Sequence, residues 1–78
     1  MDMPGYRPIR TLTPRELAVV RLLGSGCSYG QAAAHLGISP HTVVTHIKNA
    51  YRKLDVHTAA AAVMRAVQLG LLEVPELQ

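Results

Sequence analysis

Residues 28–54 have the sequence SYGQAAAHLGISPHTVVTHIKNAYRKL, and this stretch decides the fold. Ser28 and Ser39 are typical N-cap residues, because their hydroxyl groups can accept hydrogen bonds from the free amides of a first helical turn. Pro40 suits the first position of a helix, where its missing N–H group costs nothing. Gly37 can adopt the positive φ that ends one helix before the next begins. The stretch therefore predicts two helices joined by a tight turn, which is the pattern of a helix-turn-helix.

The second helix of this motif is expected to be amphipathic. Val43, Ile47, Ala50 and Leu54 recur at helical spacing and should form one buried stripe. A helix with an apolar stripe and a free face of hydrogen-bonding groups fits the major groove of DNA. Together with Thr42, the residues of that free face make up the expected DNA contacts: His41, Thr42, Val44, Thr45, Lys48, Asn49 and Arg52.

Five of these residues suggest particular contacts with DNA. Lys48 and Arg52 can bind phosphates or guanine edges, and His41 can donate to a phosphate. Asn49 can pair with adenine, and Thr45 can contact a thymine methyl group. His46 occupies a position that faces inward in most helix-turn-helix motifs, which favours a structural role over a base contact.

The flanking segments complete an all-α domain. Thr13-Pro14 begins a helix whose Glu16 can close a capping box. The last helix should present Ala62, Ala66 and Leu69 to the core and end before Gly70. We expect a four-helix helix-turn-helix domain at 12–72, with helices at about 14–24, 29–36, 40–54 and 59–69. A flexible N-terminal arm at 1–11, which carries Arg7 and Arg10, and a C-terminal tail at 73–78 flank it.

The composition excludes several classes of protein. The chain has 78 residues, a formal net charge of +3 and one cysteine, Cys27. It contains no run of about 18 apolar residues and no signal-peptide pattern, so we expect no membrane partner and a cytoplasmic protein. No metal-ligand spacing, activated nucleophile or glycine-rich phosphate loop is present. We therefore expect no metal, no cofactor and no catalytic residues.

Several motifs in order resemble those of the DNA-binding domain of the LuxR family of bacterial transcription regulators. They are Leu-Thr-Pro-Arg-Glu-Leu at 12–17, Leu-Gly-Ile-Ser at 36–39, Thr-Val-Val-Thr-His at 42–46, Arg-Lys-Leu-Asp-Val at 52–56 and Leu-Gly-Leu-Leu at 69–72. The resemblance implies that the helix at 40–54 enters the major groove. It also implies a homodimer formed through the last helix, with contacts near Ala60, Val63, Met64 and Val67.

The chain departs from the family pattern in ways that bear on function. Members usually have a lysine where this chain has Val44, so one phosphate or base contact should be missing. The fourth helix has Ala59 and Ala61 in place of the usual Arg and Glu, which favours self-association. Members also carry a sensing domain ahead of this one, which eleven residues cannot form, so we expect a stand-alone regulator.

The partners expected are double-stranded DNA and a second copy of the chain, with RNA polymerase or another regulator protein as a further candidate. One alternative has a different class of partner: a protein-interaction module that keeps the helix-turn-helix fold and binds DNA weakly or not at all. The two hypotheses differ in the expected effect of Lys48→Ala combined with Arg52→Ala. If the protein is a DNA-binding regulator, this double substitution should abolish DNA binding and leave partner binding intact.

Overall fold

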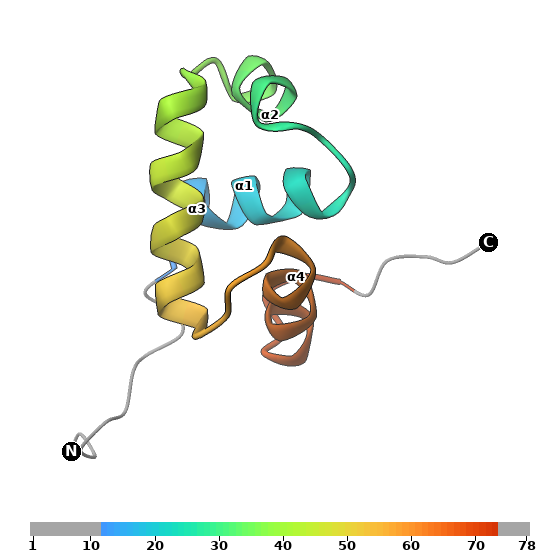
Figure 1. The fold of residues 1–78 in the computed structure, drawn as a ribbon. Coiled ribbons are helices and arrows are strands. Elements are labelled where there is room, and N and C mark those ends of the chain that lie inside the picture. Colours follow the sequence, from blue (N-terminus) through green and yellow to red (C-terminus); the bar gives the residue numbers. More distant parts are fainter. Residues whose placement is uncertain (1–11, 74–78) are drawn as a thin grey trace.

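The computed structural model describes residues 12–73, which form four α-helices (Figure 1). They are α1 (Pro14–Gly24), α2 (Tyr29–Leu36), α3 (Pro40–Leu54) and α4 (Ala59–Gln68). The expected all-α class and the four helices are thus confirmed. The longest helix, α3, has the other three on one side, and its opposite side is uncovered. The expected arm at 1–11, with Arg7 and Arg10, and residues 74–78 of the expected tail lie outside the described residues.

The helices begin where their capping residues predict. The Thr13 hydroxyl accepts from the Glu16 amide at 3.1 Å, and the Glu16 carboxylate accepts from the Thr13 amide at 2.9 Å. Ser28 and Gln31 form the same reciprocal pair at the start of α2. The Ser39 hydroxyl accepts from the amide of Thr42, the third residue of α3. These bonds satisfy amides that have no partner within their own helix, which is why local sequence fixes the helix starts.

The turn between α2 and α3 depends on a left-handed residue. Gly37 has φ 69° and ψ 32°, and the next amide, that of Ile38, donates to the Ala33 carbonyl at 3.0 Å. This conformation is open to glycine at no steric cost. It sets α2 across the N-terminal end of α3. Ala33 of α2 is buried in the core.

The core gathers side chains from all four helices. The predicted stripe on α3 is confirmed, since Val43, Ile47, Ala50 and Leu54 are at most 1% exposed. The stripe belongs to one cluster with Val19, Val20, Ala32 and Ala62, which are also fully buried. Ala66 of α4 is fully buried as well. A buried stripe of this kind fixes which face of α3 points outward.

The last helix differs from the expectation at its end. Leu69 is 41% exposed and lies beyond the final residue of α4, so the prediction that it faces the core is wrong. The chain leaves the helix at Leu69, and Gly70 has φ 77°. The helix therefore ends one residue earlier than expected, and helical spacing does not predict the position of Leu69. No helix among residues 12–73 has both the length and the hydrophobicity that crossing a membrane requires.

Candidate nucleic-acid interface

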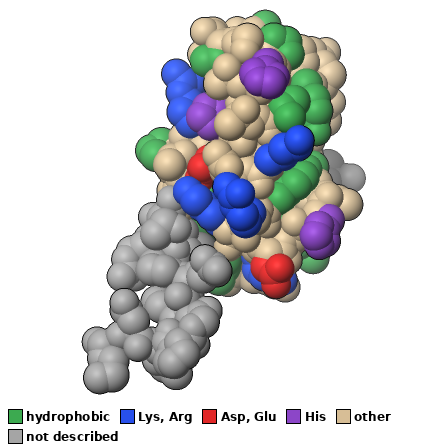
Figure 2. All heavy atoms as spheres, turned by 60° about the vertical axis from the view of Figure 1, so that its left-hand side comes forward, with side chains coloured by type: hydrophobic (Ala, Val, Ile, Leu, Met, Phe, Trp, Pro, Cys, Tyr) green, Lys and Arg blue, Asp and Glu red, His purple; other side chains and the backbone are tan. Residues whose placement is uncertain are grey.

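The uncovered side of α3 carries the side chains that the sequence nominates for DNA contact. His41, Thr45, Lys48 and Arg52 are exposed. The other three nominated residues, Thr42, Val44 and Asn49, are half-buried. Figure 2 turns this side forward, and Lys and Arg side chains gather around its middle. The structure thus brings the seven nominated residues together on one helix.

The N-terminal half of this surface is polar and uncharged. The Thr42 hydroxyl lies 2.9 Å from the hydroxyl of Ser39, so Thr42 takes part in the cap as well as flanking the exposed face. The Thr45 hydroxyl donates to the His41 carbonyl at 3.3 Å, one helical turn back. That bond engages the polar end of Thr45 and leaves its methyl group for apolar contact.

The C-terminal half of the surface is cationic. This half borders a shallow hollow that is open to solvent. The hollow is lined by Lys48, Tyr51, Arg52, Asp55, Val56 and His57. Burial raises the pKa of Tyr51, and the nearby Tyr29 adds to that effect. Tyr51 therefore stays a neutral hydroxyl at neutral pH.

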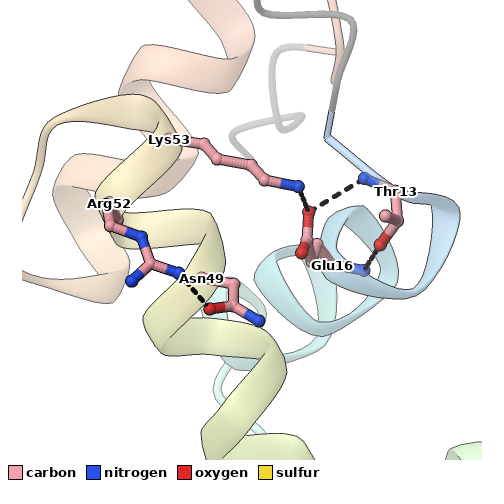
Figure 3. A network of polar contacts seen from close by, with 5 residues as sticks. All are labelled: Thr13, Glu16, Asn49, Arg52 and Lys53. Atoms are coloured by element: carbon pink, nitrogen blue, oxygen red, sulfur yellow. Dashed lines mark hydrogen bonds and ion pairs between the residues drawn. The ribbon is translucent and has the colours of Figure 1, made fainter.

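A buried carboxylate fixes α3 against α1. The Lys53 ammonium lies 2.9 Å from the carboxylate of Glu16, which is 4% exposed (Figure 3). Burial alone would raise the pKa of Glu16, but the Lys53 hydrogen bond, the Thr13 amide and the Lys53 charge together lower it. The capping box accounts for only part of the role of Glu16. Sequence reasoning missed the ion pair, because its partners are 37 residues apart.

Two arginines are also used within the fold. Arg65 donates to the Leu54 carbonyl at 2.8 Å and so joins α4 to the C-terminal end of α3. Arg15 donates to the Leu36 carbonyl at 3.3 Å, at the end of α2. A cation on a terminal carbonyl is favourable because the helix dipole is negative there. Basic residues that a charge count would assign to DNA thus help to hold the helices together.

The nominated dimer residues on α4 fall into two groups. Ala60 is exposed and Met64 is 63% exposed, which leaves an apolar surface open. Val67 is half-buried. Val63 packs against the core, and one of its methyl groups lies beside Gly24 of α1. Within one copy, then, Val63 already has an apolar neighbour, whereas Met64 projects outward.

No group of three or more His, Cys, Asp or Glu side chains that could hold a metal ion occurs in the part of the chain that the structure describes. His46 is half-buried on α3, away from the most exposed positions. Cys27 is half-buried and packs at the edge of the core.

Comparison with known proteins gives the family. Residues 10–66 match the family described as bacterial regulatory proteins, luxR family. The chain belongs to this family. The luxR-family match covers all of α1, α2 and α3 and most of α4.

Individual luxR-family relatives agree with the match. The chain is 49% identical over 55 residues to a nitrate/nitrite response regulator protein homolog of Haemophilus influenzae, covering 70% of this chain and 26% of that protein. It is 44% identical over 64 residues to the transcriptional activator protein CarR of Pectobacterium carotovorum subsp. carotovorum, covering 82% of this chain and 26% of that protein. The chain thus spans about a quarter of the length of these curated relatives.

A solved structure shares the fold over nearly its whole length. The structure of the transcription factor GerE superimposes with a TM-score of 0.74 at 34% identity, covering 86% of this chain and 97% of that one.

Proposed function

We propose that this luxR-family domain is a sequence-specific, double-stranded DNA-binding regulator of transcription, with α3 in the major groove. The observation that carries the proposal is the uncovered side of α3, where exposed hydrogen-bonding and cationic side chains lie opposite a fully buried stripe. A helix that protrudes in this way can enter a groove about 12 Å wide without moving the rest of the fold. The relatives named as transcription regulators support it.

The two halves of α3 have different roles in this proposal. Lys48 and Arg52, on the C-terminal half, bind phosphates or guanine edges. On the N-terminal half, His41 donates to a phosphate, and the free methyl group of Thr45 contacts a thymine methyl. Val44 adds an apolar contact at the position where family members usually have a lysine. The electrostatic part of the affinity for DNA is therefore small.

We further propose that two copies bind DNA together through α4. Met64 and Ala60 present an apolar surface that one copy leaves open, and Val67 borders it. A two-fold axis at this surface would place two α3 helices on one side of a duplex, as paired half-sites require. In this proposal the protein acts in the cytoplasm, where it binds DNA and catalyses no reaction. RNA polymerase or another regulator is a candidate for a protein partner on the DNA.

The test is a fluorescence-anisotropy titration of random duplex DNA across a range of salt concentrations. A domain that contacts about four phosphates should lose affinity with a log–log slope of about −3 to −4. Lys48→Ala should make the slope shallower by about 1. Arg21→Ala is the matched control, because it removes the same charge from the last turn of α1, away from α3, and should change the slope little. A wild-type protein that shows no binding at low salt would refute the proposal and favour the protein-interaction module.

A further inference from the structure

Asn49 and Arg52 stand almost one turn apart on the exposed side of α3 and are joined by a hydrogen bond. The guanidinium of Arg52 donates to the Oδ1 atom of Asn49, as Figure 3 shows. A guanidinium has donors only, so the bond fixes which end of the amide faces it. The Asn49 oxygen is turned toward Arg52, and its nitrogen is turned away.

This pairing changes what Asn49 can offer to a base. An asparagine recognises adenine with both ends of its amide, since the oxygen accepts from N6 and the nitrogen donates to N7. Here the oxygen already accepts one bond and lies beside a full positive charge. An adenine amino group that approached this oxygen would bring its own positive edge against the guanidinium. The amide nitrogen has no such obstacle.

The remaining N–H groups of the Arg52 guanidinium are available to donate to a base. Arg52 is exposed, and within residues 12–73 no carboxylate lies within ion-pairing distance of it. Lys53, the next residue, points to the other side of the helix, toward Glu16 (Figure 3). Asn49 and Arg52 together therefore present a row of N–H donors, and the one acceptor between them, the Asn49 Oδ1 atom, already accepts from Arg52.

Guanine is the base that fits a row of donors. Its major-groove edge presents two adjacent acceptors, N7 and O6, whereas adenine presents one acceptor and one donor. We propose that Asn49 and Arg52 act as one unit that selects guanine over adenine, in contrast to the adenine contact that Asn49 alone suggests. This inference rests on the proposed function, because it requires α3 to lie in the groove.

The test is selection of duplexes from a random pool by the wild-type protein and three variants. Asn49→Ala identifies the base position that the pair contacts, because preference at that position should weaken. The wild type should favour guanine there by at least about fivefold. Arg52→Met keeps the apolar stem but frees the amide oxygen, and should shift the preference at that position to adenine. Arg21→Met is the matched control, because it removes a charge of the same kind from the last turn of α1, away from α3, and should leave guanine preferred at the same position.

The results separate this inference from the proposal on which it rests. Wild-type preference for adenine at the position, or guanine still preferred after Arg52→Met, would overturn the inference while sequence-specific binding stands. Failure of the wild type to bind DNA in the salt titration would instead overturn the proposed function and the inference with it. Circular dichroism of each variant confirms that the exposed substitutions leave the helices intact.

Discussion

The contact between α1 and α4 makes Gly24→Ala a sharp test of the packing. A Cβ atom at Gly24 would lie 2.2 Å from the Cγ2 atom of Val63. Ordinary contacts between carbon atoms are about 3.5–4.0 Å, so the two atoms would have to separate by more than about 1.3 Å. Val63 cannot relieve this easily by rotation, because a helical valine strongly prefers one χ1 rotamer. Either the helices move apart or the valine adopts a strained rotamer.

Two opposing terms set the size of the effect. Alanine in place of a helical glycine gains up to about 1 kcal/mol of intrinsic helix stability. Overpacking of this kind costs about 1–3 kcal/mol. We therefore expect Gly24→Ala to lower the free energy of unfolding by about 1–2 kcal/mol. In a Val63→Ala background the clashing methyl group is gone, so the same substitution should raise the free energy by up to about 1 kcal/mol.

The assay is urea unfolding of four proteins: the wild type, each single variant and the double variant. Gly30→Ala serves as the matched control, because a Cβ there meets only the Ser28 Oγ atom, at 3.9 Å, and should stabilise α2. If Gly24→Ala stabilises the protein as Gly30→Ala does, the tight contact between α1 and α4 is refuted. Val63 would then be free to contribute to a surface on α4.

Four further predictions concern Lys53, Glu16, Asp55 and Met64. Lys53→Met should destabilise the fold by about 1–2 kcal/mol, measured by urea unfolding, because it leaves the Glu16 carboxylate buried beside an apolar group. Because the pKa of Glu16 is lowered in the fold, its carboxylate stabilises the fold at neutral pH, and this contribution is lost as the pH falls through the folded-state pKa. The wild type should therefore lose more stability than Lys53→Met between about pH 5 and about pH 3. Asp55→Gly should raise the thermal midpoint, with a gain of about 0.5–1 kcal/mol, because Asp55 has φ 60°; an unchanged midpoint would show that no strain is stored there. Met64→Glu should weaken self-association in sedimentation velocity without loss of helix content, since Met64 is 63% exposed.

The helix starts and the end of α2 were predictable because their causes are local. Thr13, Ser28 and Ser39 each cap a helix within three residues of their own position. Gly37 ends α2 through its own backbone conformation. None of these effects depends on a distant part of the chain, so the sequence is sufficient to place them.

The contacts that orient the helices were not predictable in the same way. Glu16 meets Lys53, and Arg65 meets the Leu54 carbonyl, only after the chain has folded. Helical spacing also grouped Val63 with Met64, although Val63 already packs against α1 within one copy. Periodicity identifies a face of a helix, but the crossing angle of the neighbouring helix decides how much of that face it covers.

The distribution of charge bears on how the domain would distinguish one DNA sequence from another. No Asp, Glu, Lys or Arg occurs from Leu22 to Ile47, and on α3 the Lys53 charge is turned to Glu16. Lys48 and Arg52 are then the exposed cations of the α3 face. Binding that is independent of sequence depends on the number of phosphates neutralised, so this term should be weak here. Discrimination must therefore come from base edges, and the orientation in which Arg52 holds the Asn49 amide matters more than it would in a protein with many phosphate contacts.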